Sequence, residues 1–197
     1  MTHVAVVGGG PAGLSAALFA AKNGLEVTVF DTDATPMHRA RLFNYLGVGE
    51  SDGVDGTAFV ERARRQVDRY GVDWRHETVT GLLKDGSEFV VTTDAGECAA
   101  DYVVLASGRA RELAAELGCD RTADGTVVAD RDGRTSVAGV YAAGWVARGE
   151  KVQAIISAGD GAAAALDILS EVRGAPFHDF DYADADRDAD DGKRSAT

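Results

Sequence analysis

The stretch Val4-Ala5-Val6-Val7-Gly8-Gly9-Gly10-Pro11-Ala12-Gly13 decides the fold of this chain. The four apolar residues predict a buried strand, and the glycines after them predict a tight turn into a helix over 11–23. Gly8 permits the sharp reversal, Gly10 lets a pyrophosphate approach bare backbone, and Gly13 lets the helix pack closely on the strand. Free N–H groups and the dipole at the helix N-terminus favour an anion there. The turn is therefore typical of a dinucleotide-binding site.

The next residues complete a strand–helix–strand unit. Apolar side chains recur at helical spacing up to Gly24, which ends the helix. A second strand, over 26–30, is followed by Asp31, and a carboxylate at this place suits the two hydroxyls of an adenosine ribose. The alternative is a glycine-rich turn that binds nothing, and the complete unit argues against it.

Length and composition exclude several classes of protein. A chain of 197 residues is long enough for one large core. Its net charge of −12 argues against nucleic acid or an anionic membrane as a partner. No stretch resembles a signal peptide or a membrane span, so we expect a cytoplasmic protein. Cys98 and Cys119 have neither redox-pair nor metal-ligand spacing, and we predict no metal site.

The acidic residues far outnumber the lysines: 22 Asp and 10 Glu stand against 4 Lys and 16 Arg. This balance suits a halophilic protein, because concentrated salt screens the self-repulsion of the acidic residues. An ordinary acidic protein with an acidic tail is the alternative.

Two segments after Asp31 carry polar candidates. The long loop over 32–56 holds Arg39 and Arg41, which could clamp a phosphate, and Asn44, which could bond a bound ring. Solvated arginines are the equal alternative. A helix to Tyr70 follows, capped by Thr57. We interpret its four arginines as a solvated face offset by neighbouring acids: Arg62, Arg64, Arg65 and Arg69.

The remaining segments predict an α/β fold. Strands are expected over 72–77, 79–83, 88–93, 102–106, 127–128 and 139–143, with a short helix over 109–118 and a long one over 152–172. The apolar run over 102–106 fits a parallel strand covered on both faces. We therefore expect a Rossmann-like domain with a mostly parallel sheet, helices on one side and a three-stranded β-meander on the other. Residues 175–197 are expected to form a disordered acidic tail, whose start Phe177, Phe180 and Tyr182 could dock.

Three separated segments resemble one family. They are the Gly8–Ala17 turn and helix start, Tyr102 to Gly108, and Thr135 to Gly144, the last followed by Val152 to Gly161. With the loop from Phe43 to Val48, they resemble the FAD-binding domain of thioredoxin reductase-like pyridine nucleotide-disulfide oxidoreductases. The resemblance implies a single FAD-binding domain over 1–174, made of segments 1–108 and 135–174.

The resemblance also implies the residues that contact FAD. Gly8, Gly10 and Gly13 would hold the pyrophosphate, Asp31 the ribose, and Gly144 the phosphate-ribityl arm. Gln153 and Ala154 would face the pyrimidine edge of the flavin, where a helix N-terminus stabilises the negative charge of the reduced ring. The full expected set is Gly8, Gly10, Pro11, Ala12, Gly13, Asp31, Asn44, Val79, Ala106, Ser107, Gly108, Gly144, Trp145, Gln153 and Ala154.

The chain departs from the family in three ways. A stretch of about 26 residues, 109–134, stands where the family inserts its NADPH domain. No Cys-x-x-Cys dithiol is present, so disulfide reduction by the usual route is excluded. Trp145 replaces an acidic residue that would bond the ribityl chain. It could stack on a ligand, fill space left by the absent domain, or block part of the flavin pocket.

Three functions follow as hypotheses. The first is a minimal FAD-dependent oxidoreductase, reduced by NAD(P)H directly or by a protein partner. The second is a non-catalytic FAD- or dinucleotide-binding module, such as a sensor, carrier or assembly subunit. The third, a domain that binds NAD(H), is disfavoured by the segment 135–161. The electron donor and acceptor are left open, as is a homodimer. We identify no catalytic residue, and His38 and His76 are the mid-chain candidates for an acid or base.

Overall fold

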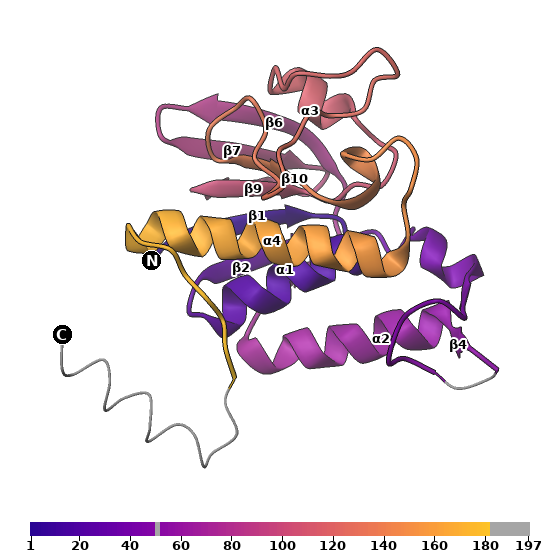
Figure 1. The fold of residues 1–197 in the computed structure, drawn as a ribbon. Coiled ribbons are helices and arrows are strands. Elements are labelled where there is room, and N and C mark those ends of the chain that lie inside the picture. Colours follow the sequence, from indigo (N-terminus) through magenta and orange to yellow (C-terminus); the bar gives the residue numbers. More distant parts are fainter. Residues whose placement is uncertain (50–51, 182–197) are drawn as a thin grey trace, which may run out of the picture.

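A five-stranded parallel sheet forms the centre of this computed structural model, which describes residues 1–49 and 52–181 (Figure 1). Each strand hydrogen-bonds in parallel to its neighbours. In spatial order the strands are β10 (Val140–Ala142), β9 (Tyr102–Leu105), β1 (His3–Val7), β2 (Glu26–Phe30) and β5 (Asp73–Arg75).

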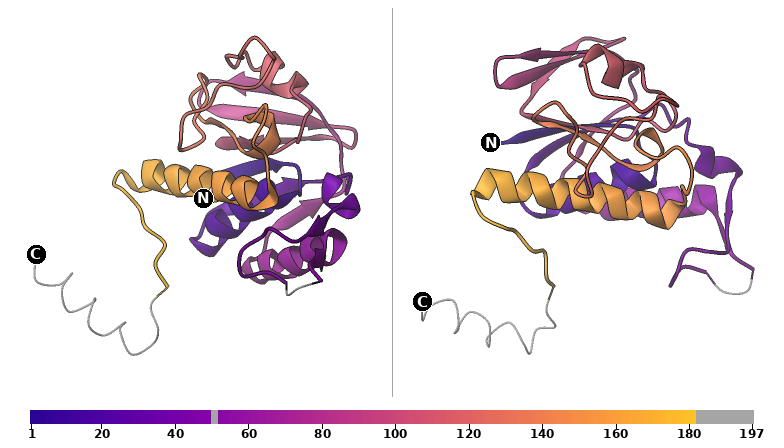
Figure 2. Two further views of the ribbon diagram at one scale, coloured as in Figure 1. Left: turned by 45° about the vertical axis from the view of Figure 1, so that its right-hand side comes forward. Right: turned by 45° about the horizontal axis from the view of Figure 1, so that its top comes forward.

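Different layers cover the two faces of the sheet (Figure 2). One face packs against the helices α1 (Pro11–Lys22), α2 (Gly56–Val67) and α4 (Ala154–Arg173). The other packs against an antiparallel meander of β6 (Val79–Asp85), β7 (Glu88–Thr93) and β8 (Glu97–Ala100), and against α3 (Glu112–Glu116). This arrangement confirms the predicted fold class.

Alternation along β1 explains why both faces are apolar. Val4 and Val6 belong to the core under the helices, whereas Ala5 and Val7 belong to the core under the meander. Successive side chains of a strand point to opposite faces, so a strand that is covered twice must be apolar throughout. That requirement accounts for the continuous apolar runs in the sequence.

The direction in which successive strands are added to the sheet reverses once, at β1. From β1 the chain proceeds outward through β2 to β5, and then returns to the other side of β1 to form β9 and β10. The loops that follow β1 and β9 therefore diverge and leave a crevice at the carboxyl edge of the sheet. Ligands of doubly wound sheets bind in such a crevice.

Short elements complete the structure. Three of them, η1, β3 and β4, lie in the loop that was predicted over 32–56. The short elements are the 3-10 helices η1 (Pro36–Arg39), η2 (Asp68–Tyr70) and η3 (Gly144–Val146) and the paired strands β3 (Arg41–Leu42) and β4 (Val54–Asp55).

Several predicted boundaries were wrong. Asp55, rather than Thr57, caps α2, because its carboxylate accepts hydrogen bonds from the backbone N–H groups of Thr57 (3.0 Å) and Ala58 (3.1 Å). The third strand of the meander, β8, lies in a segment with no predicted strand. The segment predicted as a strand over 127–128 makes an isolated bridge between Val127 and Arg121.

The residues after α4 contact the body of the domain. Lys22 of α1 pairs with Asp179 at 2.9 Å and with Asp181 at 2.6 Å, and the guanidinium of Arg173 lies 3.8 Å from the ring centroid of Phe177. The rest of the predicted tail, 182–197, lies outside the described residues. Within the described residues, no helix has the length and apolar character needed to cross a membrane.

Candidate functional site

A cavity of about 530 Å³ lies at the crevice between the ends of β1 and β9. Its wall combines the glycine-rich turn, the loop after β9, the loop after β2 and the start of α4. Most residues of the expected set line it: Gly8, Gly10, Pro11, Ala12, Asp31, Asn44, Val79, Ala106, Ser107, Gly108, Trp145, Gln153 and Ala154.

Gly13 and Gly144 are the two members of that set that do not line the cavity. A Cβ on Gly13 would collide with the carbonyl oxygen of Gly8, so this glycine serves the packing of α1 on β1. Gly144 is buried, and a Cβ there would lie 3.0 Å from Ala12 and 3.2 Å from the Ser157 hydroxyl. Its N–H donates a 3.2 Å hydrogen bond to Asp160. Both glycines thus allow the elements that form the cavity wall to pack closely against one another.

The glycine-rich turn leaves open backbone on the cavity side. Gly8 has φ +109°, and a Cβ there would lie 2.5 Å from the carbonyl oxygen of Ala106, so the turn and the end of β9 approach closely. A Cβ on Gly10 would meet Thr35 Oγ1 at 3.3 Å. The space beside Gly10 is therefore open to the cavity, so a ligand can approach the backbone there.

Two helices point their N-termini into this cavity. Gly10 caps α1 and Gln153 caps α4, and neither end has a hydrogen bond from a capping side chain. The N–H groups of a first helical turn have no partner within the helix. Both termini therefore present free donors and a partial positive charge to an anionic or carbonyl-bearing ligand.

Amide and aromatic side chains form the end of the cavity near α4. Asn44 Nδ2 donates to Gln153 Oε1 at 3.0 Å, which joins residues 109 positions apart. Trp145 lines the wall, and the guanidinium of Arg109 lies 4.1 Å from its ring centroid. Trp145 thus has a cation on its ring, as in a cation–π contact.

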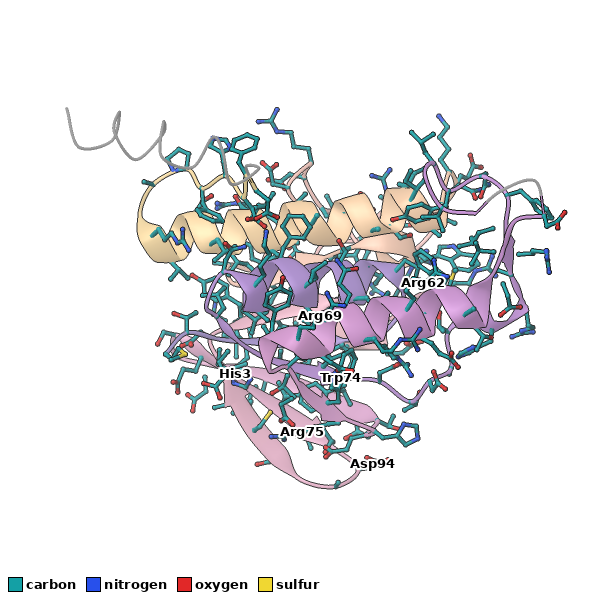
Figure 3. The ribbon with its side chains drawn as sticks, turned by 90° about the horizontal axis from the view of Figure 1, so that it is seen from below. His3, Arg62, Arg69, Trp74, Arg75 and Asp94 are labelled. Atoms are coloured by element: carbon teal, nitrogen blue, oxygen red, sulfur yellow. The ribbon has the colours of Figure 1, made fainter. Side chains whose placement is uncertain are left out.

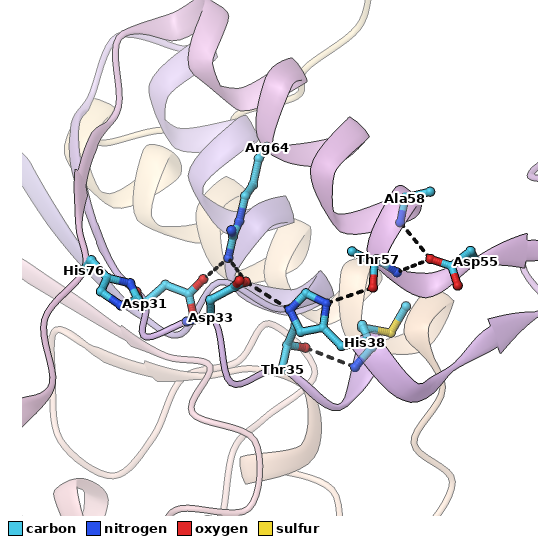
Figure 4. Close-up of polar contacts among 10 residues, drawn as sticks. Asp31, Asp33, Thr35, His38, Asp55, Thr57, Ala58, Arg64 and His76 are labelled. Atoms are coloured by element: carbon cyan, nitrogen blue, oxygen red, sulfur yellow. Dashed lines mark hydrogen bonds and ion pairs between the residues drawn. The ribbon is translucent and has the colours of Figure 1, made fainter.

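Asp31 also lines the cavity, and an arginine holds its carboxylate. Arg64 of α2 donates from Nη2 to Asp31 Oδ2, and also to Asp33 Oδ1 at 2.8 Å (Figure 4). The prediction that Arg64 belongs to a solvated face was wrong, because its side chain is 28% exposed and its partner Asp31 is 10% exposed. Arg62 of α2 and Arg69 of η2 are exposed (Figure 3).

Sequence reasoning missed Arg64, although a signal was present. Arg64 follows Val60 by four residues and precedes Val67 by three, and both valines are fully buried. Residues at these spacings share one face of a helix, so Arg64 had to lie on the side of α2 that faces the sheet. A charged residue on such a face requires a partner of opposite charge.

The histidines and loop arginines have other partners. His38 bonds Asp33 Oδ1 and Thr57 Oγ1, both at 3.0 Å, and His76 bonds the carbonyl oxygen of Asp31 at 3.1 Å. The hydrogen bond with His38 and the charge of Arg64 lower the pKa of Asp33. Neither histidine lines the cavity. Of the loop arginines, Arg41 lines the cavity and Arg39 does not.

The two cysteines lie away from the cavity wall. Cys98 is on β8, and Cys119 follows α3 and is buried. Burial raises the pKa of both thiols. A raised pKa lowers the population of the thiolate, which is the reactive form of cysteine.

Comparison with known proteins identifies the family that this chain resembles. The profile described as "Pyridine nucleotide-disulphide oxidoreductase" matches residues 2–65 and 53–162. The thioredoxin reductase of Helicobacter pylori strain J99 is 33% identical over 113 residues, which is 55% of this chain and 36% of the relative. The ferredoxin–NADP reductase of Leuconostoc citreum is 32% identical over 112 residues, 54% of this chain and 33% of the relative. This chain thus spans about a third of the length of these relatives.

The fold is also found in solved structures. The atypical thioredoxin reductase of Desulfovibrio vulgaris Hildenborough superposes with a TM-score of 0.81 at 22% identity, over 90% of this chain and 100% of the other. At this identity the likeness concerns the fold.

Proposed function

Because the chain belongs to the pyridine nucleotide-disulphide oxidoreductase family, we propose that it is a minimal FAD-dependent oxidoreductase of thioredoxin reductase-like type. Its electrons would come from NAD(P)H directly or from a small-molecule or protein redox partner. No internal dithiol would take part.

The observation that carries this proposal is the joining of two distant segments at one cavity. The turn over 8–12 and the start of α4 at 153–154 line the same space of about 530 Å³. A dinucleotide that carries a flavin needs a phosphate site and a ring site at some distance from one another. The cavity supports that demand, since its wall combines the backbone donors of the glycine-rich turn, the Asp31 carboxylate and the side-chain amides of Asn44 and Gln153.

The residues present fit FAD group by group. The first turn of α1 and the backbone of Gly10 would hold the pyrophosphate, and Asp31 would accept hydrogen bonds from the ribose hydroxyls. The N-terminus of α4 would lie at the pyrimidine edge, with the Asn44–Gln153 pair beside the ring. Bound FAD would supply the redox chemistry, while the protein supplies binding and electrostatics.

Two observations favour an external electron donor. Cys98 and Cys119 lie outside the cavity wall, and burial disfavours both thiolates. Between β9 and β10 the chain forms α3 and turns, in place of a second dinucleotide-binding unit. A donor would therefore have to reach the flavin from solvent. Trp145 lines the cavity wall, and the guanidinium of Arg109 lies over its ring.

Purified protein that is saturated with FAD and then treated anaerobically with NADH or NADPH tests the proposal. We expect a yellow complex of one FAD per chain, whose absorbance near 450 nm bleaches with a nicotinamide donor or with a reduced carrier protein. The measurements should be made in both dilute and concentrated KCl, because the acidic composition is typical of a halophilic protein. Colourless protein that takes up no added FAD at either salt concentration would refute the proposal.

A non-catalytic FAD-binding module is the second candidate. It is favoured by the histidines, which lie outside the cavity wall and bond Asp33, Thr57 and the backbone of Asp31. The two candidates predict different spectra: the module keeps its flavin oxidised with every donor, whereas the enzyme bleaches. Mass analysis of the released nucleotide separates both from an NAD(H)-binding domain.

A further inference from the structure

Arg64 joins two carboxylates, one of which, Asp31, lines the cavity. Its Nη2 atom donates to Asp31 Oδ2 and to Asp33 Oδ1, at 2.8 Å for the latter (Figure 4). Asp31 Oδ1 in turn accepts the backbone N–H of Asp33 at 3.2 Å. One guanidinium nitrogen thus holds both carboxylates in place.

The guanidinium is itself held from several sides. The guanidinium carbon of Arg64 lies 5.9 Å from the ring centroid of Trp74, a residue of β5. Asp33 is fixed from the far side by His38, which bonds Thr57 at the start of α2. Arg64 Nε is buried and has no hydrogen-bond partner among the described residues. The contacts of this side chain therefore concentrate on the Asp31–Asp33 pair.

Without Arg64, the carboxylates of Asp31 and Asp33 would lose the positive charge that they share. Both bond the same nitrogen atom, so they lie close together, and like charges at short range repel. Asp31 would relieve the repulsion by turning away from Asp33. Asp31 Oδ2 lies beside Gly9, where a Cβ would collide with it, so such a turn would change how the carboxylate sits against the glycine-rich turn.

We propose that Arg64 is a positioning residue for nucleotide binding: it holds the Asp31 carboxylate at the angle at which its remaining lone pairs accept the two hydroxyls of an adenosine ribose. This inference rests on the proposed function. Each carboxylate oxygen can accept more than one hydrogen bond, so the ion pair leaves Asp31 able to bind the diol. Arg64 acts through Asp31 and needs no contact of its own with the nucleotide.

A double-mutant cycle on FAD affinity tests the proposal. The variants are Arg64→Met, Asp31→Asn and the double variant, with Arg65→Met as a matched control. Arg65 is the next residue of α2, is 66% exposed, and has an ion pair only with Glu61 at 4.0 Å among the described residues. We expect Arg64→Met to raise the dissociation constant of FAD about tenfold, or about 1.4 kcal/mol. Arg65→Met should leave the dissociation constant unchanged.

The decisive readout is the effect of Arg64→Met in the Asp31→Asn background. A residue that acts through Asp31 loses its effect there, so the change should be less than about twofold, a coupling expected of residues in one network. A residue with a merely structural role would weaken binding equally in both backgrounds. Equal losses, or unchanged affinity in Arg64→Met, would overturn the proposal. Near-ultraviolet circular dichroism of the apo forms checks folding, and Arg64→Lys, which keeps the charge, should recover part of the affinity.

The cycle also separates this proposal from the one on which it rests. Wild-type protein that binds no FAD would overturn the proposed function and the role of Arg64 together. Wild-type protein that binds FAD, with losses that simply add in the cycle, would overturn the role of Arg64 alone.

Discussion

Gly10 offers the clearest separation of nucleotide binding from folding. Its backbone is extended, with φ −80° and ψ −174°, a conformation that any residue adopts. Beyond its chain neighbours, a Cβ there meets a single heavy atom within 4 Å, the Thr35 hydroxyl oxygen at 3.3 Å. A Cβ on Gly13 would instead collide with backbone. Gly10→Ala should therefore fold normally and place its methyl group in the cavity.

The expected magnitudes follow from this geometry. Replacing glycine by alanine reduces the entropy of the unfolded chain, by about 0.4–1 kcal/mol, and alanine is a poorer N-cap by a similar amount. The free energy of unfolding of the apo protein should thus change by less than about 1 kcal/mol. In the complex, the methyl group takes space needed by the pyrophosphate. Overpacking costs about 1–3 kcal/mol, so the dissociation constant of FAD should rise about 5- to 150-fold.

The assay is equilibrium titration of FAD, with thermal unfolding of the apo forms measured in the same buffer. Gly96→Ala is the matched control, because a Cβ there has no heavy atom within 4 Å and Gly96 lies between β7 and β8, away from the cavity wall. If Gly10→Ala bound FAD as tightly as the control did, the nucleotide would not pass over this turn, and the assignment of the phosphate site would be refuted.

Three further predictions concern the stability of the fold. Gly161→Ala should lower the free energy of unfolding by about 3 kcal/mol or more in a denaturant titration, because the added Cβ collides with the backbone of α1. Tyr141→Phe should lower it by about 1.5 kcal/mol, since the buried hydroxyl donates to Asp167 at 2.7 Å. The hydrogen bond with His38 lowers the pKa of Asp33 below its ordinary value of 3.8, so this carboxylate stabilises the fold above that pH. Asp33→Asn should therefore destabilise the protein at pH 7, and its difference from wild type should shrink as the pH falls below 3.8; a constant difference would contradict the linkage.

Local chemistry made much of this fold predictable from the sequence. The bounds of the strand over 26–30 and the start of the helix at Pro11 were predicted as observed, because apolar periodicity and a glycine or proline mark each of them. The β8 strand was missed, because Glu97–Ala100 is short and lacks β-branched residues. Its strand character comes from pairing with β7.

The residues of the candidate site likewise include some that the sequence predicted and some that it did not. The glycine turn and Asp31 were predictable, because a backbone approach and a carboxylate at a strand end are local features. Gly144 was expected at the cavity, yet it packs between Ala12 and Ser157. The sequence contains no information on which neighbour a glycine accommodates, since that neighbour comes from another helix.

The sequence by itself determined the glycine-rich turn after β1, the continuous apolar runs of the buried parallel strands and the absence of a Cys-x-x-Cys pair, since each depends on residues close together in the chain. Only the tertiary structure decided that Asn44 meets Gln153, that Arg109 stacks on Trp145 and that Arg64 holds Asp31. Each of these pairs joins separate elements. Their contacts depend on how the elements pack across the sheet, and that packing is a property of the whole core rather than of any one segment.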